Sequence, residues 1–376
     1  MVSERMRMLD VFAGVGGFSL ALKYACRTVA YYEIDDGCTT ILKSNIDKKQ
    51  LDDAPIVPDV STITQHDIQK LNPFIVCAGF PCQDISVMTR GQHGVQGARS
   101  GIVFKLLQAL KGTNVKLVFL ENSSMIRIRG LEYFKQQLKL AGFPYLVEDL
   151  FSAKQCGAPH RRLRWFGVAY KDPSDFRKIS CELKGSSFWN KEPCRRVLKR
   201  QPDKTRHDAS MARFFVMGNA VVPECVKYAF TMLKADVLGY SRPASPKYEL
   251  PIIQLDFPDR SKTVVGWATP TRSTTTQCRR YTRRCASRLT DQLFYEKTTF
   301  RGLQLPAVAN QMFQVNPRWV CWLMGYPTDW TTAPCTSRGA PELPHFAFDG
   351  ELASVHQGLE GLLRKDMLGV AATCAA

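Results

Sequence analysis

The sequence predicts an α/β fold in which an apolar, parallel β-sheet carries helices on both faces. Six short apolar runs alternate with stretches of helical period over residues 6–170, an alternation typical of β-α-β units. Polar residues directly follow several of the runs, which places candidate functional side chains at the carboxyl edge of the sheet. With 376 residues, of which 45% are hydrophobic, the chain is long enough for one large domain and a smaller, irregular second region.

The expected elements follow one another in a regular order. The apolar runs that predict strands are MRMLDVFAG, TVAYYEID, PFIVCAGF, VKLVFLEN, YLVEDLFSA and RWFGVAY. The stretches that predict helices between them are FSLALKYAC, GIVFKLLQALK and LEYFKQQLKLAG. We therefore expect four parts: a sheet domain over residues 1–170, a short basic insertion over 171–216, a helix over 217–240 that returns to the sheet, and a C-terminal region over 241–376.

Charge and composition restrict the partners that the chain can have. A formal net charge of +17 favours a polyanion, and nucleic acid is the first candidate. No apolar run reaches the length of about 18 residues that a membrane span needs, and the first residues, MVSERMRMLDVF, are too charged for a secretory signal. We therefore expect a soluble, intracellular protein without a membrane partner. The 13 cysteines include no C-x-x-C pair, which predicts neither a disulfide framework nor a metal site.

A glycine-rich turn follows the first expected strand, in the stretch LDVFAGVGGFSLAL. Gly14, Gly16 and Gly17 allow a tight turn and the close approach of a ligand, and the start of the next helix favours negative groups. The spacing differs from the G-x-G-x-x-G of dinucleotide enzymes, which argues against a nicotinamide-dependent oxidoreductase. Glu33, after the second strand, is a candidate acceptor for ribose hydroxyls, and Asp67 is a similar third-strand candidate for an adenine amino group. A purely structural turn and two solvated acids are the alternatives.

Cys82, in the stretch AGFPCQDIS, is the candidate nucleophile. It lies beyond the apolar run that contains Cys77 and follows a proline, so that it is expected at the carboxyl edge of the sheet. A buried core thiol is the alternative. Glu121 directly follows another apolar run, in VKLVFLENSSM. Burial at a strand end raises the pKa of a carboxyl group and allows it to donate a proton.

Two arginines complete the set of candidates. Arg162 and Arg164 alternate with Leu163 and Trp165 in the stretch GAPHRRLRWFGVA. In a strand, this alternation directs both guanidinium groups to one face and both apolar side chains to the core. There the guanidinium groups are suited to lower the pKa of a thiol and to hold a phosphate or a carbonyl. An exposed basic face is the alternative.

The kinds and the order of these motifs resemble the DNA (cytosine-5) methyltransferases. The matching stretches are DVFAGVGGF for the cofactor turn, GFPCQDIS for the nucleophile loop, ENSSM for the glutamate loop, GAPHRRLR for the arginine strand and GNAVVP for the returning helix. The resemblance covers residues 8–233 and implies a Rossmann-like methyltransferase sheet with S-adenosylmethionine as cofactor. It also implies double-stranded DNA as the partner, bound by a monomer, and segments near the C-terminus resemble phage- and virus-type members.

The resemblance further implies a mechanism and a set of binding residues. Cys82 attacks carbon 6 of a flipped cytosine, Glu121 acts at ring nitrogen 3, and carbon 5 then accepts the methyl group. Arg162 and Arg164 position the base and the backbone. The implied cofactor-binding residues are Phe12, Gly14, Gly16, Gly17, Glu33, Asp67, Asn219 and Val221. The candidate DNA contacts are Gln83, Ser86, Arg279, Arg280, Arg283 and Arg284, the four arginines having a solvated basic loop as their alternative.

The sequence also departs from the family pattern. His160 stands where the family usually has glutamine, and Ile34 follows Glu33 where an aromatic ring often stacks on adenine. The interval before GNAVVP is short, so DNA recognition is expected in residues 171–216 or 241–376. A tryptophan-rich stretch near the C-terminus has helical spacing that predicts a core helix: Trp319, Trp322, Leu323 and Met324. A transfer RNA cytosine-5 methyltransferase and a catalytically silent DNA-binding homologue remain the alternative functions.

Overall fold

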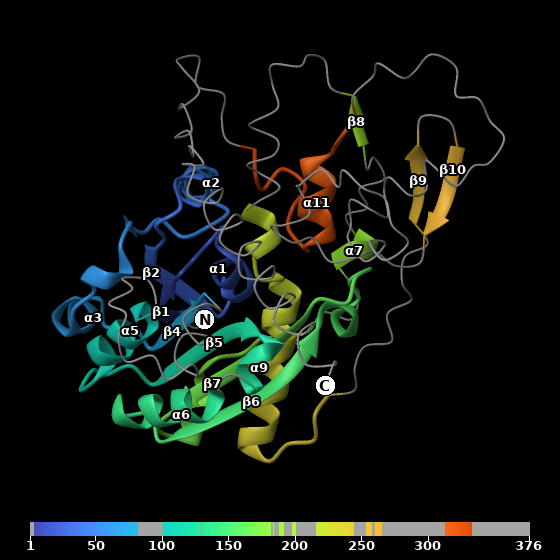
Figure 1. Ribbon diagram of the computed structural model, residues 1–376. Coiled ribbons are helices and arrows are strands. Elements are labelled where there is room, and N and C mark those ends of the chain that lie inside the picture. The colour runs from blue at the N-terminus through green and yellow to red at the C-terminus, as the bar shows by residue number, and fades with distance from the viewer. Residues whose placement is uncertain are drawn as a thin grey trace, which may run out of the picture. The chain divides into compact units, whose positions relative to one another are not determined.

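The computed structural model describes residues 4–81, 101–128, 130–181, 183, 188–191, 198–200, 216–243, 253–257, 260–264 and 313–332. By its contacts the chain divides into two compact units, Met1–Ala333 and Pro334–Ala376, and all described residues belong to the first. Their centre is a seven-stranded sheet with the strand order β3-β2-β1-β4-β5-β7-β6 (Figure 1). This order confirms the expected α/β class and the Rossmann-like methyltransferase sheet.

The strands of this sheet are β1 (Met6–Val11), β2 (Cys26–Tyr32), β3 (Ile56–Val57), β4 (Ile75–Gly79), β5 (Leu117–Ser123), β6 (Tyr145–Ser152) and β7 (Leu163–Tyr170). The α-helices that accompany it are α1 (Gly17–Leu22), α2 (Asp36–Asp47), α3 (Gln65–Leu71), α5 (Ile102–Leu110), α6 (Leu131–Leu140), α7 (Phe188–Lys191), α9 (Pro223–Leu238) and α11 (Pro317–Leu323). Short 3-10 turns are η1 (Val60–Thr62), η2 (Ser124–Arg127), η3 (Ala153–Cys156) and η4 (Pro173–Lys178). Two small ladders pair β8 (Leu198–Arg200) with β11 (Phe313–Val315) and β9 (Ile253–Phe257) with β10 (Arg260–Val264).

The direction of β7 corrects the expectation of a parallel sheet. β1 pairs in parallel with β2 and β4, and β4 pairs in parallel with β5. β7 instead runs antiparallel to both β5 and β6. The link from β6 to β7 contains only η3 and a few further residues, which is too short for the crossover helix that a parallel pair needs. The start of β7 therefore lies at the same edge of the sheet as the carboxyl end of β5.

The two faces of the sheet carry separate apolar cores. One core joins side chains of β1, β4 and β5, such as Met8 and Phe119, to α1, α2, α9 and α11. The other joins alternate residues of the same strands, such as Leu9 and Val118, to α3, α5 and α6. The alternation of strand side chains between the two faces produces this division. The expected core side chains of α11, including Trp319 and Trp322, are confirmed as buried.

The helix that returns to the sheet has clear boundary signals. α9 begins with Pro223 at its first position, where the missing N–H group has no intrahelical partner to lose. It ends at Gly239, whose φ of 68° suits the left-handed cap. α9 packs on α1 and on the β6–β7 side of the sheet. No helix among the described residues is long and apolar enough to span a membrane.

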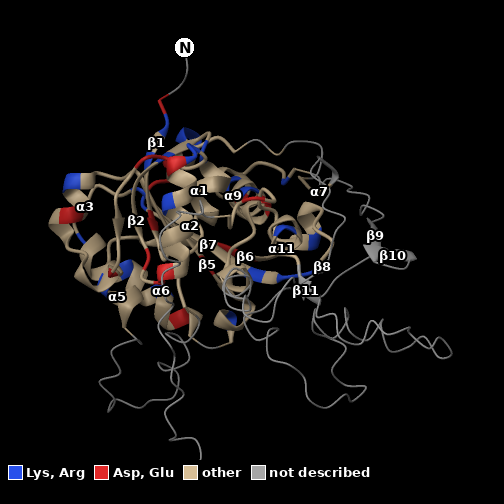
Figure 2. Ribbon diagram, turned by 90° about the horizontal axis from the view of Figure 1, so that it is seen from above, with Lys and Arg blue, Asp and Glu red and all other residues tan. Residues whose placement is uncertain are grey.

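Charged residues of both signs surround the described part of the sheet domain. Figure 2 shows lysines and arginines interspersed with aspartates and glutamates over the helices in this view. The basic stretch that contains Arg279, Arg280, Arg283 and Arg284 lies outside the described residues. The four-part division of the chain therefore stays a prediction.

Candidate active site

The glycine-rich turn between β1 and α1 has the backbone that its sequence predicts. Gly14 and Gly16 have φ angles of 56° and 84°, in the left-handed region that glycine tolerates best. Phe12, at the end of β1, also has a positive φ of 56° and lies half-buried against the α3/α5/α6 core. Apart from Gly14 and its two chain neighbours, no heavy atom of the described residues lies within 4 Å of the position that a Cβ on Gly14 would take. The described part of the chain therefore leaves room beside Gly14 for part of a ligand.

Glu33 lies at the end of β2 and is fixed by the glycine turn. The amide N–H of Gly14 donates to Glu33 Oε2 over 2.6 Å, and the N–H of Asp35 donates to Oε1 over 2.8 Å. Burial raises the pKa of Glu33, although both of these backbone hydrogen bonds lower it. Each carboxylate oxygen has a further lone pair, so the group can accept hydroxyl protons of a ligand at this edge. The neighbouring Ile34 is 72% exposed.

Asp67 does not follow the third strand, which corrects the position expected for it. β3 comprises only Ile56–Val57, and Asp67 lies on α3, where its carboxylate accepts hydrogen bonds from the N–H and the Oγ1–H of Thr64. This pair is a capping box that begins the helix, and the bonds from Thr64 lower the pKa of Asp67. The carboxylate that follows β3 is that of Asp59, which caps η1. β3 is too short, at two residues, for its apolar pattern to be recognised in the sequence.

Glu121 and Arg164 form an ion pair at the carboxyl edge of the sheet. Glu121 is 9% exposed, and its Oε1 lies 3.1 Å from Arg164 Nε. Burial raises the pKa of Glu121, while the positive charges of Arg164 and Arg162 lower it. The pair forms because β7 is antiparallel, with Arg164 opposite Ser123 in the ladder.

The same edge carries the start of the loop that contains Cys82. Gly79 is opposite Glu121 in the β4–β5 ladder, and a Cβ on Gly79 would lie 3.6 Å from Glu121 Oε2. The side-chain amide of Asn122 donates to the carbonyl of Phe80 over 3.0 Å. Asn122, in the glutamate loop, therefore binds the backbone two positions before Cys82. Cys82 itself, with Gln83 and Ser86, lies outside the described residues.

Arg162 does not pair with Glu121 but contacts the returning segment, which is the stretch GNAVVP at residues 218–223. Its Nη1 donates to Gly218 O over 3.1 Å and its Nη2 donates to Ala220 O over 2.7 Å. The side chain is 5% exposed, and burial, with the nearby charge of Arg164, lowers the pKa of Arg162 to about 9. Two carbonyls of GNAVVP are thus held by one guanidinium group. They flank Asn219, which is exposed, and precede Val221, which is half-buried.

The expected pattern of the arginine strand is correct only in part. Trp165 is fully buried, as predicted, but Leu163 is 44% exposed. Leu163 is the first residue of β7, and burial along the strand begins two residues later, at Trp165. Arg162 precedes the strand and has a positive φ of 22°, so strict strand alternation begins only after it. Both guanidinium groups nevertheless act electrostatically on Glu121.

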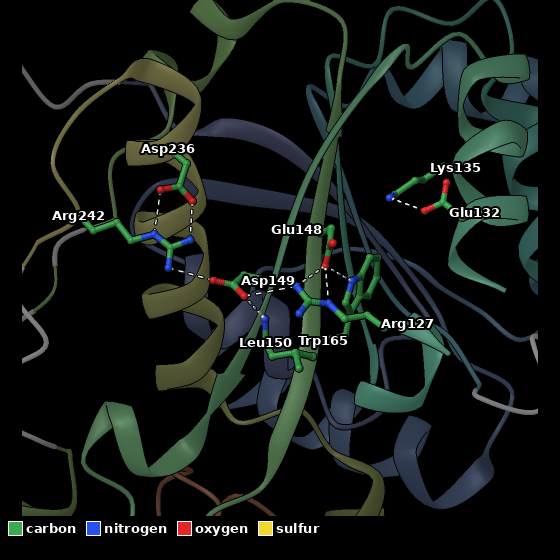
Figure 3. A network of polar contacts seen from close by, with 9 residues as sticks. All are labelled: Arg127, Glu132, Lys135, Glu148, Asp149, Leu150, Trp165, Asp236 and Arg242. Carbon is green, nitrogen blue, oxygen red and sulfur yellow. Dashed lines mark hydrogen bonds and ion pairs between the residues drawn. The ribbon is translucent and has the colours of Figure 1, made fainter. Parts of the chain in front are cut away.

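A network of charged groups braces the loop that follows Glu121. Arg127, at the end of η2, donates from Nη2 to Glu148 over 2.8 Å and to Asp149 over 3.3 Å (Figure 3). The indole N–H of Trp165 also donates to Glu148, over 2.8 Å. Arg242 joins Asp149 to Asp236, near the end of α9. The network therefore connects η2, β6, β7 and α9 behind the edge of the sheet.

Two further groups near the site are buried, although no apolar periodicity in the sequence predicts their burial. Asp10, in β1, is fully buried, and burial raises its pKa to about 7. His160 is 3% exposed, and burial with the charge of Arg162 lowers its pKa to about 3, so the ring is neutral. His160 Nε2 lies 2.9 Å from the carbonyl of Leu323 in α11, and this acceptor requires the proton on Nε2.

Comparison with known proteins agrees with the motif order. A family model described as C-5 cytosine-specific DNA methylase matches residues 6–210. The type II methyltransferase M.CviJI of Paramecium bursaria Chlorella virus IL3A is 28% identical over 231 residues, which are 60% of this chain and 59% of that relative. The type II methyltransferase M.HhaI of Haemophilus parahaemolyticus is 30% identical over 173 residues, 44% of this chain and 50% of that relative.

Solved structures give a more distant similarity. The crystal structure of the S. pombe Dnmt2 methyltransferase has 22% sequence identity and a TM-score of 0.37, over 44% of this chain and 51% of that one. The matched regions cover 59% of M.CviJI and 50% of M.HhaI, so the chain spans about half of the length of these relatives.

Proposed function

The chain belongs to the C-5 cytosine-specific DNA methylases, and we propose that it transfers a methyl group from S-adenosylmethionine to carbon 5 of cytosine in double-stranded DNA. The observation that carries the proposal is the buried Glu121–Arg164 pair beside Gly79 and Phe80, which lead into the loop of Cys82. The proposed proton donor thus lies beside the residues that precede the candidate nucleophile, which supports a site where both groups act on one cytosine ring.

Cys82 is the proposed nucleophile and Glu121 the proposed proton donor. Attack of the Cys82 thiolate on carbon 6 forms a sulfur–carbon bond and moves the electrons of the 5,6 double bond toward carbon 5. A proton or hydrogen bond from Glu121 stabilises ring nitrogen 3, which gains electron density during the attack. The raised pKa of Glu121 favours this role because the group keeps its proton to higher pH than an exposed glutamate. Carbon 5 then bonds to the methyl group as the methyl–sulfur bond of S-adenosylmethionine breaks. Loss of the carbon 5 proton and elimination of the Cys82 sulfur, which breaks the sulfur–carbon bond, restore the 5,6 double bond.

The two arginines are proposed to position the substrate and the site. Because a cytosine inside a duplex is inaccessible to the sheet edge, the base must leave the stack to reach Cys82. Arg164, with 27% of its side chain exposed, holds Glu121 and retains donors for the flipped base. Arg162 acts from behind, through the two carbonyls of the returning segment.

The residues around the glycine turn fit S-adenosylmethionine, which supplies a methyl group on a positively charged sulfur. The space beside Gly14 and the carboxylate of Glu33, held by two backbone N–H groups, support this fit. We assign the ribose hydroxyls to Glu33, and Asp59 takes the place proposed for Asp67 near the adenine because it follows β3. The methionine part is assigned to the following residues: Phe12, Gly14, Gly16, Gly17, Asn219 and Val221.

Methyl transfer by the full-length protein tests the proposal directly. Labelled S-adenosylmethionine is offered with mixed-sequence duplex DNA or with transfer RNA, and we expect label in the DNA and a covalent adduct with 5-fluorocytosine DNA. The Cys82→Ala variant should lose both. Cys77→Ala is the matched control, because Cys77 is fully buried with its thiol 3.5 Å from Met8 Sδ and should not affect transfer.

Each alternative function has its own outcome in this experiment. Full activity of Cys82→Ala would refute the nucleophile assignment. Label in transfer RNA alone would support the transfer RNA enzyme, and DNA binding without transfer would support the silent homologue. We also propose that one copy of the chain acts on each site, because a flipped base needs a single active site. A dimer on DNA in native mass spectrometry would contradict this.

A further inference from the structure

The α11 segment, residues 316–332, contacts the glycine turn from the far end of the sequence. The indole N–H of Trp330 donates to the carbonyl of Val15 over 2.8 Å, across a separation of 315 positions. Trp330 is fully buried, and its own carbonyl accepts from Asn45 Nδ2 in α2 over 3.0 Å. Since Val15 lies between Gly14 and Gly16, this contact reaches the middle of the turn.

Tyr326 of the same segment contacts the other wall of the proposed cofactor site. Its hydroxyl donates to the carbonyl of Val221 over 2.7 Å, and the residue is fully buried. A Cβ on Gly17 would overlap both the Tyr326 hydroxyl and Val221 Cγ1. The turn, the returning segment and Tyr326 therefore meet at one closely packed point.

The segment is anchored independently of these two contacts. The carbonyl of Leu323 accepts hydrogen bonds from His160 Nε2 over 2.9 Å and from Trp189 Nε1 over 3.2 Å. Asn316 caps α11 by accepting the N–H of Arg318, and Pro317 begins the helix. A rigid anchor of this kind fixes where Trp330 and Tyr326 lie before a ligand arrives.

The glycine turn is closed by one backbone bond of its own, from the N–H of Gly16 to the carbonyl of Ala13, and other groups of the turn are bound from outside it. The N–H of Gly14 is bound by Glu33 and the carbonyl of Val15 by Trp330, so two side chains hold opposite groups of the turn. Glycines at positive φ retain freedom that ordinary residues lack, and that freedom lowers ligand affinity unless it is removed beforehand. Tertiary hydrogen bonds to the turn remove it.

We propose that Trp330 and Tyr326 are positioning residues that hold the glycine turn and the returning segment in their cofactor-binding arrangement. The α11 segment then sets the affinity for S-adenosylmethionine and leaves the bond-making residues untouched. This inference rests on the proposed function for the identity of the ligand. Two contacts of the α11 segment support it: Trp330 binds Val15 in the glycine turn, and Tyr326 binds Val221 in the returning segment.

Two matched tryptophan variants of the full-length chain test the inference. Trp330→Phe removes the indole N–H that binds Val15. Trp322→Phe removes the same atoms from a residue that is 1% exposed and whose indole N–H has no hydrogen-bond partner among the described residues. Binding of S-adenosylhomocysteine is measured by titration calorimetry, exchange of the amides in residues 13–17 by mass spectrometry, and transfer by kcat and the KM for S-adenosylmethionine.

We expect Trp330→Phe to weaken binding about ten-fold, as the loss of one buried hydrogen bond and its unpaired carbonyl implies. Exchange in residues 13–17 should accelerate, KM should rise, and kcat should change by less than about two-fold. Trp322→Phe should match the wild type in all four measurements. Tyr326→Phe, which removes only a hydroxyl, provides a milder second variant and should also weaken binding.

The outcomes separate this inference from the proposed function. Equal changes in the two tryptophan variants would refute the positioning role, since packing alone would then explain both. A fall in kcat at unchanged affinity would refute it as well. If the wild type binds no S-adenosylhomocysteine, the proposed function fails and the inference fails with it. Normal binding by Tyr326→Phe, with its fold intact by circular dichroism, would remove Tyr326 from the assignment.

Discussion

Replacement of Asp10 by asparagine should remove the pH dependence that this carboxylate imposes on stability. Asp10 Oδ2 accepts hydrogen bonds from Ser19 N–H over 3.2 Å and from Ser19 Oγ over 2.6 Å, and Oδ1 has no partner among the described residues. Burial raises the pKa of Asp10 from 3.8 to about 7, with a further contribution from the charge of Glu33, although Ser19 lowers it. The carboxylate therefore ionises in the folded protein at a cost.

The size of the effect follows from proton linkage. Between pH 3.8 and about 7 the folded protein retains the proton of Asp10 and the unfolded chain does not. The free energy of unfolding therefore falls by about 1.4 kcal/mol for each pH unit in this window, about 4 kcal/mol in all. Asparagine cannot ionise and still accepts from Ser19, and the bonds from Ser19 to the charged carboxylate are already included in the pKa of about 7. We expect Asp10→Asn to exceed the wild type by up to about 4 kcal/mol at pH 8.

Urea unfolding at several pH values from 5 to 8 measures this prediction. The advantage of Asp10→Asn should shrink as pH falls, because the wild-type carboxyl group becomes protonated in the folded state. Asp67→Asn is the control: hydrogen bonds from Thr64 lower the pKa of Asp67 below 3.8, so the folded and unfolded states both carry its charge from pH 5 to 8, and this variant should lose the same amount of stability at every pH. Parallel stability curves for the wild type and Asp10→Asn would refute the reasoning, and so would an advantage at pH 8 no larger than that at pH 5.

Two further predictions concern the packing around the site. In Gly17→Ala, the new Cβ overlaps the Tyr326 hydroxyl and Val221, so the unfolding midpoint should fall by an amount equivalent to about 1–3 kcal/mol. Gly101→Ala is the control, because its φ of −124° is negative and, beyond its chain neighbours, no heavy atom of the described residues lies within 4 Å of the new Cβ. It should lose less stability, and the reverse order would contradict the close packing. In Arg162→Lys, one ammonium group replaces the guanidinium group that binds the carbonyls of Gly218 and Ala220. One of these carbonyls is then left unpaired, which should lower the free energy of unfolding in urea by about 1–3 kcal/mol. Wild-type stability of this variant would show that the second hydrogen bond is dispensable.

Local patterns predicted the elements that the structure confirms. Apolar runs and helical periods located six of the seven strands of the main sheet, together with α1, α5, α6 and α9. They missed β3 because Ile56–Val57 is a two-residue strand, too short for any alternation to show. Asp67 was consequently placed after a strand instead of in the capping box of α3. A strand was recognised in the sequence only if it was long enough. Because β3 was missed, Asp67 was assigned a position that it does not have.

Contacts between distant parts of the chain were beyond these patterns. The helical spacing of Trp319 and Trp322 correctly predicted burial, yet nothing in it indicated that Trp330 would reach Val15. The sequence likewise does not indicate that Asp10 is buried. A single acidic residue in an apolar strand looks the same in the sequence whether or not other elements cover it. The burial of Asp10 arises only when α1 and the α11 side of the core pack over β1. Tertiary packing, which acts across hundreds of positions, decides such features.

The direction of β7 shows how topology and chemistry depend on one another. In a fully parallel sheet the beginning of the last strand would lie at the amino edge, and Arg164 would be a strand length away from the carboxyl end of β5. The short β6–β7 link forces an antiparallel pair, which places Arg164 opposite Ser123 and 3.1 Å from Glu121. The same reversal lets Arg162 bind the carbonyls of Gly218 and Ala220. The proposed proton donor, its charge partner and the returning segment therefore meet because one connection is too short to contain a helix.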